Sequence, residues 1–261
     1  MTKNLPKISL ITPTLNQSKF IKQTIISVLS QKYPNLEYIV IDGGSTDDTV
    51  KILKSFGNKL KWISEKDKGQ SSAINKGLKI ATGEMLGYLN SDDYLEKNAL
   101  WKVSEYFSDN KDAYWLTGKC RIVDQKGKEV RKFITIYKNI FLKYLRFKPI
   151  FYIIQFISQP ATFWRKDVVK KIGVFDESLY YSMDYEYWLR IWKNYKLHFL
   201  NDYLACYRIH SFSKTVTNPK GQFDEEYSVV SRYTRNPLIG LLHRFHIKLA
   251  LFVYQLLKRR N

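Results

Sequence analysis

Carboxylates stand where two apolar runs of the chain end. Asp42 closes one run, and the pair Asp92 and Asp93 follows another, Met85–Leu89. Two adjacent carboxylates are costly unless a cation or hydrogen-bond donors balance their charge. Their oxygens suit Mg²⁺ or Mn²⁺ bridging a diphosphate. The alternative is a cap for a helix beginning near Leu95.

Two more polar residues follow apolar runs in the same way. Asn16 comes after Ile8–Thr12, and Asp67 comes after Leu60–Ser64. Helix-like segments alternate with these runs, an order typical of an α/β domain with a mostly parallel sheet. Ligands of such sheets bind at the carboxyl ends of the strands, so we expect these polar groups to share one rim. The expected helices begin after Ser18, after Ser45 or Thr46, near Gln70 and near Leu95.

The two loops that precede helices have two interpretations each. The stretch from Asp42 to Asp47 contains two glycines and is similar to a phosphate-binding turn, because backbone N–H groups can approach a ligand there. A tight turn with a Ser45…Asp48 capping box is the alternative, although it leaves Asp42 unexplained. The stretch from Lys66 to Gln70 could bind a base or phosphate, or be a solvated loop.

The second half of the chain offers a candidate base and a candidate metal ligand. Strands are expected over 114–123, 159–165 and 197–208, and a helix over 182–192. Asp184 at the start of that helix could deprotonate a hydroxyl group, or simply favour the positive end of the helix dipole. Glu186 is two residues away and points elsewhere, so we expect only one of them to reach the site. His210 is either a metal or phosphate contact or an ordinary histidine.

Taken in order, the motifs resemble those of the family 2 glycosyltransferases, which have the GT-A fold. The likeness covers roughly residues 7–215 and rests on these stretches: Ile11–Asn16, Ile41–Asp47, Asp67–Gln70 with Asn75–Gly77, Leu89–Asp93, Ile172–Glu177, Met183–Arg190 and Tyr207–His210. The resemblance implies an inverting transfer of a sugar from a nucleoside diphosphate donor, with UDP as the expected nucleotide.

The resemblance also implies a role for individual residues. Pro13, Asn16, Asp42 and Asp67 would line the nucleoside pocket, with Gly69 and Gln70 beside them. Asp92 would contact ribose or sugar, Asp93 would hold Mn²⁺ or Mg²⁺, and His210 would approach the metal or diphosphate. Asp184 would be the catalytic base, with Glu186 in reserve.

Three positions depart from the family pattern. Gly43 stands where many relatives have a second acid, Asn90 stands where many have an acid, and Met183 stands where glutamate is frequent. The first weakens inferences about the base. The second leaves Asp93 with more of the metal assignment, and the third leaves Asp184 as the better base.

Composition sets the size and setting of the protein. With 261 residues, 44% of them hydrophobic, the chain can bury one sizeable core. We expect a catalytic domain over 1–215 and a basic amphipathic helical segment over 216–261. Cys120 and Cys206 are expected as buried thiols in a reducing compartment. Neither a secretory signal nor an uncharged membrane-spanning stretch is expected.

The net charge of +19 is unevenly placed. Residues 131–166 and 227–261 contain no acid and together hold 15 Lys and Arg residues. Within the second stretch, Leu241, Phe245, Leu249, Phe252, Val253 and Leu256 recur at helical spacing, with Arg244, Lys248, Gln255 and Arg259 opposite. This pattern favours a helix in an anionic membrane interface. A helix packed on the domain with its basic face in water is the alternative. No nucleic-acid motif is found, so nucleic acid is not expected as a partner.

Together these features predict an enzyme of bacterial surface polysaccharide synthesis, in the cytoplasm and peripheral at the inner face of the cell membrane. Its acceptor would be a saccharide, free or lipid-linked. A sugar nucleotidyltransferase is one alternative, but Pro13–Lys19 lacks the Gly-rich, basic loop expected after the first strand of that class. A module that binds a nucleotide sugar without transferring it is the other.

Overall fold

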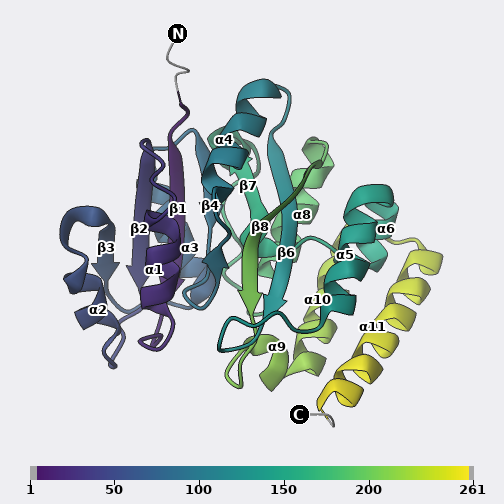
Figure 1. The fold of residues 1–261 in the computed structure, drawn as a ribbon. Coiled ribbons are helices and arrows are strands. Elements are labelled where there is room, and N and C mark those ends of the chain that lie inside the picture. Colours follow the sequence, from purple (N-terminus) through teal and green to yellow (C-terminus); the bar gives the residue numbers. More distant parts are fainter. Residues whose placement is uncertain (1–4, 259–261) are drawn as a thin grey trace.

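A computed structural model describes residues 5–258 and shows one eight-stranded sheet covered by helices on both faces (Figure 1). The strands lie in the order β3-β2-β1-β4-β7-β6-β8-β5. Their bounds are β1 Ile8–Thr14, β2 Leu36–Asp42, β3 Lys61–Ser64, β4 Met85–Tyr88, β5 Tyr94–Leu95, β6 Trp115–Val123, β7 Thr162–Arg165 and β8 His198–Arg208.

The sheet is mostly parallel, as the alternating pattern predicts. Strands β3, β2, β1 and β4 are parallel, and so is the pair β6 and β8. β7 runs antiparallel to both of its neighbours, and the short β5 is antiparallel to β8. The carboxyl ends of β1, β4, β6 and β8 therefore point to one rim, where ligands of such sheets bind.

Helices and 3₁₀ turns connect the strands. Their bounds are α1 Ile21–Leu29, α2 Thr49–Ser55, η1 Gly57–Lys59, α3 Gln70–Ile80, α4 Ala99–Asp109, α5 Lys132–Tyr144, α6 Lys148–Ile153, η2 Gln159–Ala161, α7 Lys166–Ile172, α8 Met183–Asn194, α9 Lys214–Thr217, α10 Pro219–Tyr233 and α11 Pro237–Lys258.

The core has two apolar layers because side chains alternate along each strand. On β1, Leu10 packs into the layer that contains residues of α1 and α4, and Ile11 packs into the layer that contains residues of α3 and α8. Val40 and Ile41 of β2 divide in the same way. Both faces of the strands are thus buried, which explains why they read as continuous apolar runs.

The two expected helix caps, at Ser18 and at Ser45 or Thr46, are wrong. α1 begins only at Ile21, and Ser18 uses its N–H to donate to the Asp47 carboxylate. α2 begins at Thr49 with no side-chain cap, because the Ser45 hydroxyl group donates to Asp42 instead. The proposed Ser45…Asp48 capping box is therefore absent.

The helix expected near Leu95 begins at Ala99 and has Asn98 before it. Tyr94–Leu95 forms β5, which pairs with β8. Asp92 and Asp93 therefore precede a strand and cap no helix. This excludes the helix-cap interpretation of the acidic pair.

After residue 215, α10 contributes residues to the core and α11 lies at the surface. Val229 and Val230 of α10 are buried in the same layer as α8. α11 lies against α6 and α10 at one edge of the molecule (Figure 1). Sequence patterns did not identify α5, α6 or α7, whereas α10 and α11 lie in the segment 216–261 expected to be helical. Within residues 5–258, no helix combines the length and hydropathy needed to cross a membrane.

Replacing either of two helical glycines by alanine tests the packing, and the two variants should change the stability of the fold in opposite directions. A Cβ on Gly77 would lie 2.5 Å from Cγ2 of Ile11, so Gly77→Ala should push α3 away from β1 and destabilise the fold by about 1–3 kcal/mol. A Cβ on Gly240 of α11 meets nothing closer than 3.8 Å, so Gly240→Ala should stabilise by roughly 0.5–1 kcal/mol. Urea denaturation of both variants measures the difference; equal effects would contradict the packing.

Candidate active site

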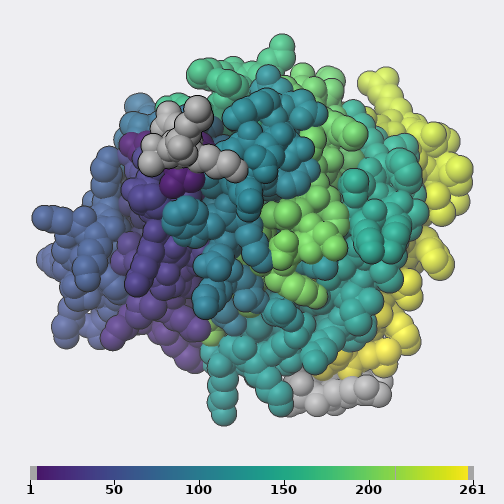
Figure 2. Space-filling view, turned by 45° about the horizontal axis from the view of Figure 1, so that its top comes forward, coloured from purple at the N-terminus to yellow at the C-terminus, as the bar shows by residue number. Residues whose placement is uncertain are grey.

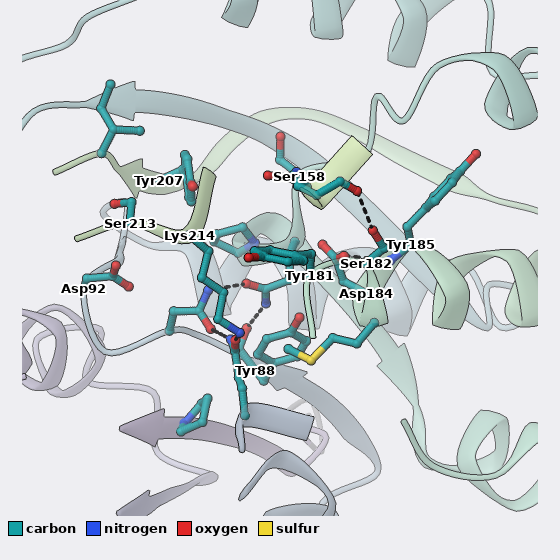
Figure 3. A pocket seen from close by; sticks show the side chains of 18 of the residues that line it. Tyr88, Asp92, Ser158, Tyr181, Ser182, Asp184, Tyr185, Tyr207, Ser213 and Lys214 are labelled. Atoms are coloured by element: carbon teal, nitrogen blue, oxygen red, sulfur yellow. Dashed lines mark hydrogen bonds between the residues drawn. The ribbon is translucent and has the colours of Figure 1, made fainter. Parts of the chain in front are cut away.

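One cavity of about 540 Å³ opens at the carboxyl ends of the strands (Figure 3). Its walls come from segments far apart in sequence: the ends of β1, β4, β6 and β8, the start of α3 and α8, and the inner faces of α5, α10 and α11. Of the ten predicted site residues, seven line it, namely Pro13, Asp67, Gly69, Gln70, Asp92, Asp184 and His210. Asn16, Asp42 and Asp93 do not.

The adjacent acids after β4 face opposite ways. Asp92 lines the cavity, whereas Asp93 is fully buried behind its wall. Oδ1 of Asp93 accepts a hydrogen bond from the backbone N–H of Arg208 at 2.8 Å. Burial first, and then the charge of Asp92, raises the pKa of Asp93 well above its ordinary value. The sequence assigned the metal to Asp93, but the geometry places Asp92 where an ion could reach it.

Arg208 at the end of β8 holds this acidic loop in place. The guanidinium group is 1% exposed and donates to the carbonyl oxygen of Asp92 at 2.7 Å. It also donates to the carbonyl of Gln125 at 2.7 Å and to Oε1 of Gln23 at 2.6 Å. A buried guanidinium group whose hydrogen bonds are all made to protein oxygens links the end of β8 to the loop after β4.

His210 is the partner of Asp92 in the cavity. Its Nε2 lies 2.9 Å from Oδ2 of Asp92, and its Nδ1 accepts a hydrogen bond from the backbone N–H of Phe212 at 3.2 Å. A neutral ring that accepts at Nδ1 carries its proton on Nε2, so His210 donates to Asp92. The two side chains therefore meet at one point of the rim, as the sequence predicts.

Asp42 and Asn16 shape the rim without lining the cavity. Oδ2 of Asp42, which is 0% exposed, accepts from the Ser64 hydroxyl group at 2.6 Å and from the Ser45 N–H at 3.0 Å. Asn16 has a left-handed backbone (φ 52°), and its Oδ1 accepts from the Thr46 N–H at 2.8 Å. Both side chains thus join neighbouring loops, which leaves the direct nucleoside contacts predicted for them without support from the geometry.

The glycine at position 43, one of the departures from the family pattern, is explained by steric hindrance from Asp67. A Cβ at Gly43 would lie 2.8 Å from Oδ2 of Asp67, which is too close for real atoms. The carboxylate of Asp67 therefore occupies the space that a side chain at 43 would fill. It faces the cavity and accepts from the Gly69 N–H at 2.8 Å.

Asn90 also has a reason to be an amide. Its Oδ1 accepts from Nε2 of Gln70 at 2.7 Å, and its Nδ2 donates to Oε1 of Gln159 at 3.3 Å. A carboxylate can only accept, so an aspartate here would lose one of these bonds. Lys214 donates to Oε1 of Gln70 at 3.0 Å and continues the chain of hydrogen bonds across the cavity.

Asp184 and Glu186 lie in different places: Asp184 is in the wall of the cavity and Glu186 is outside it. Asp184 lines the cavity, and burial raises the pKa of its carboxyl group, with the nearby Lys138 opposing the rise. Glu186 instead accepts from Nε of Arg190 at 2.8 Å and from the Tyr233 hydroxyl group, outside the cavity. Glu186 therefore ties α8 to α10 and has no free oxygen to offer a substrate.

Sequence reasoning missed several charged residues of the cavity. Lys138 of α5, Glu226 of α10 and Lys214 of α9 all line it. Lys214 follows the motif that contains His210 by four positions, a spacing that could have marked it. Lys138 and Glu226 carry no local signal, because only the tertiary packing of α5 and α10 brings them to the cavity.

The residues at the rim fit an ion that arrives with a diphosphate. Asp92 supplies a carboxylate, and His210, whose two ring nitrogens are both engaged in hydrogen bonds, orients that carboxylate instead of binding the ion as predicted. Within residues 5–258 there is no group of three or more His, Cys, Asp or Glu side chains arranged to hold a metal. Mg²⁺ and similar ions are commonly held by one or two protein ligands plus phosphate oxygens. The site therefore suits a nucleotide-bound ion better than a resident one.

The sequence comparison defines the class of protein. The model of glycosyl transferase family 2 matches residues 9–173, so the chain belongs to this family. An uncharacterized glycosyltransferase of Rickettsia prowazekii is 28% identical over 95% of this chain and 80% of its own length. TuaG of Bacillus subtilis, described as a teichuronic acid biosynthesis glycosyltransferase, is 36% identical over 51% of this chain and 54% of its own.

Solved structures share the fold. TarS 1–349 of S. aureus, in complex with UDP-GlcNAc, superposes with a TM-score of 0.67 at 23% identity, covering 86% of this chain. Our chain covers 65% of that one, less than two thirds. A mannosyltransferase of Pyrobaculum calidifontis, in complex with GDP-Man and Mn²⁺, gives a TM-score of 0.69 at 17% identity over 92% of this chain and 69% of that one. The GT-A fold expected from the sequence is confirmed, and the protein is a glycosyltransferase.

Substitution of the two adjacent acids separates their roles. Asp92→Asn should weaken Mn²⁺-dependent binding of UDP roughly tenfold or more, because it removes a ligand from the cavity. Asp93→Asn should change that affinity by less than about threefold, because Asp93 does not face the cavity. Isothermal titration calorimetry with UDP, with and without Mn²⁺, measures both. A larger loss of affinity in Asp93→Asn than in Asp92→Asn would instead support Asp93 as the metal ligand.

Proposed function

We propose that this protein is an inverting glycosyltransferase that uses a nucleoside diphosphate sugar, with UDP-sugar as the first donor to test. The single observation that carries the proposal is that one cavity joins Asp92 and His210 at the strand ends to Asp184 at the start of α8. The relationship to TuaG supports surface polysaccharide synthesis as the setting. The acceptor is then a saccharide, free or lipid-linked.

The end of the cavity formed by β1 and α3 is proposed to take the donor. Pro13 near the end of β1, Asp67 and Gly69 of the loop before α3, and Gln70 at the start of α3 line it. Asp92 would hold a divalent ion on the diphosphate, with His210 orienting its carboxylate, and the ion would supply electrostatic stabilisation to the departing phosphate oxygens. Lys214 adds a cation on the same side, and burial lowers the pKa of its ammonium group.

Asp184 is proposed as the base of a single displacement. Its carboxylate takes the proton of the acceptor hydroxyl group, and the oxygen forms a bond to the anomeric carbon. On the opposite face the bond to the diphosphate breaks, and the nucleotide leaves with the electron pair. Burial raises the pKa of Asp184, which makes its carboxylate a stronger proton acceptor than an exposed one.

The base assignment has a direct kinetic test. Asp184→Asn should lower kcat by about 10²–10⁴-fold, with affinity for UDP nearly unchanged. Glu186→Gln, the matched control on the same helix, should lower the thermal midpoint through its lost contact with Arg190 and leave kcat within about threefold. In the wild type, activity should fall as pH falls through the raised pKa of Asp184, because the base must be ionised. Full activity in Asp184→Asn would refute the role and favour a binding protein.

The helices at the edge of the molecule are proposed to contact an anionic membrane. α11 turns one apolar stripe outward, where Phe245 is 67% and Leu241 64% exposed. The stripe consists of Leu238, Leu241, Leu242, Phe245, Leu249, Phe252 and Leu256. α11 does pack on the domain, against α6 and α10, but it does so through another face and leaves this stripe exposed. Arg259 and Arg260, expected at the end of this helix, lie outside the described residues.

α5 extends the same apolar surface. The Tyr137 hydroxyl group lies 3.2 Å from Nε2 of His246 on α11, so the two helices are adjacent (Figure 2). α5 exposes Phe133, Ile136, Tyr137, Ile140 and Tyr144 along one face. An exposed apolar area of this length marks an interaction surface in most proteins.

Charge favours a lipid surface over a second copy of the chain as the occupant. The segments 131–166 and 227–258 contain Lys and Arg and no acid, so two copies placed face to face would repel each other. An anionic bilayer instead offers apolar depth for the stripe and negative head groups for Arg244 and Lys248, which are exposed on α11.

Vesicle sedimentation tests this surface with the full chain. Replacing Phe245 and Leu249 by serine should reduce binding to phosphatidylcholine vesicles that contain phosphatidylglycerol at least tenfold, because two large apolar groups no longer enter the interface. The matched control replaces Ile26 and Ile80, exposed residues of α1 and α3, and should bind as the wild type does. Equal binding of both double variants would contradict the lipid contact.

A further inference from the structure

The chain that leads into α8 determines where the proposed base lies. Tyr181, Ser182 and Asp184 lie together in one wall of the cavity (Figure 3). Ser182 stands at the N-cap position of α8, but its side chain caps no backbone N–H group. Its hydroxyl group instead donates to the carbonyl oxygen of Gln222 on α10 at 3.4 Å. Because α8 lacks a side-chain cap from Ser182, the start of this helix depends on contacts from other elements.

One carboxylate of α10 binds the chain before α8. Glu225 accepts hydrogen bonds from three consecutive backbone N–H groups: Oε1 accepts from Tyr180 at 2.9 Å, and Oε2 accepts from Tyr181 and from Ser182, each at 2.6 Å. Consecutive N–H groups that point the same way form a concave site for an anion. Hydrogen bonds to a carboxylate are among the stronger ones in proteins. Glu225 is therefore an anchor for this part of the chain.

Two further side chains hold the same segment. Nδ2 of Asn218, just before α10, donates to the Tyr181 hydroxyl group at 3.0 Å. Nζ of Lys214 on α9 donates to the carbonyl oxygen of Tyr180 at 2.8 Å and lies 4.0 Å from the centre of its ring. The same ammonium group donates to Gln70 at the proposed donor end. Contacts from α9 and α10 together thus fix the chain before α8 relative to the rest of the cavity.

The connection from Glu225 to the proposed base runs through the backbone. Glu225 does not line the cavity, whereas Asp184 does. Oδ1 of Asp184 accepts from the backbone N–H of Tyr185 at 2.7 Å, so the direction of its carboxyl group follows the first turn of α8. A shift of about 1 Å in the position of a reacting group can slow a reaction about 10²-fold. An anchor on Ser182, two residues before Asp184, is therefore placed to affect the rate.

We propose that Glu225 is a positioning residue for the base: its carboxylate holds the N–H groups of residues 180–182 and thereby aims the Asp184 carboxylate at the acceptor hydroxyl group. The inference rests on the proposed function and deepens it. It gives α10 a role in the reaction, although none of the sequence motifs lies on this helix. Loss of Glu225 should therefore reduce the rate more than the affinity for UDP.

Hydrogen exchange measured by mass spectrometry tests the contact without any substrate. In Glu225→Ala, the amides of residues 180–182 should exchange at least about tenfold faster than in the wild type, because their acceptor is gone. Glu225→Gln keeps the size of the side chain and one acceptor oxygen, so its exchange should be intermediate. Asp224→Ala is the matched control: it removes the neighbouring carboxylate, whose partner is Lys220 at the surface, and should leave this exchange unchanged.

A double-mutant cycle tests whether Glu225 acts through Asp184. The rate is that of UDP release with water as the acceptor, from whichever of UDP-N-acetylglucosamine, UDP-glucose and UDP-galactose the wild type turns over fastest. In that step water gives a proton to Asp184, its oxygen bonds to the anomeric carbon, and UDP leaves with the electron pair. Glu225→Ala should lower kcat about ten- to hundredfold, with affinity for UDP and Mn²⁺ within about threefold of the wild type. In an Asp184→Asn background it should have little further effect, because the group that it positions is already absent.

Either of two results would overturn the inference: unchanged exchange at residues 180–182 in Glu225→Ala, or a loss of rate in Glu225→Ala that is the same with and without the Asp184 carboxylate. If Glu225→Ala does not fold, the same comparisons with Glu225→Gln decide the question. A failure of the proposed function gives a different result, because the wild type would then bind no UDP in calorimetry. Faster exchange, together with a rate loss that disappears in Asp184→Asn, supports the inference.

Discussion

The arrangement of the active site depends on the buried guanidinium group of Arg208. It donates to the carbonyl oxygen of Asp92, and its own backbone N–H donates to the carboxylate of Asp93. Two residues further along the chain, His210 reaches the carboxylate of Asp92. Because one cation joins the loop after β4 to the end of β8, the carboxylate and the imidazole meet at the rim. Loss of one partner of such a buried charged network typically costs about 3–5 kcal/mol.

This link also explains why two adjacent acids differ in role. Asp93 turns inward as the buried partner of the β8 backbone, and Asp92 faces the cavity because its main chain is held in the opposite direction. The part of the cavity that contains Asp92 is thus built on strand ends. The rest is built on helices, of which α5 and α11 also carry the exposed apolar surface.

Sequence reasoning succeeded where local pattern decides structure. Apolar runs located the strands, and the alternation of strands and helices placed Asp67 and Asp92 at one rim. The family resemblance added Asp184 and His210, and all four residues line one cavity. Sequence reasoning failed where a side chain's direction depends on distant partners. No local sequence pattern distinguishes Asp92 from Asp93. None shows that the carboxylate of Asp42 is occupied by hydrogen bonds from the Ser45 and Ser64 hydroxyl groups. Glu226 lines the cavity only because α10 packs against it, and no motif or periodic pattern in the sequence predicts that packing.

The central claim is that Asp92 and His210 form the point where the donor's diphosphate and its ion bind. A crystal of the full chain grown with UDP and Mn²⁺, with anomalous diffraction measured near the manganese edge, tests it most directly. The account predicts one anomalous peak in contact with Asp92 and the diphosphate, with the nucleoside against Pro13 and Asp67. A peak bound by Asp93, or a nucleotide outside this cavity, would contradict it.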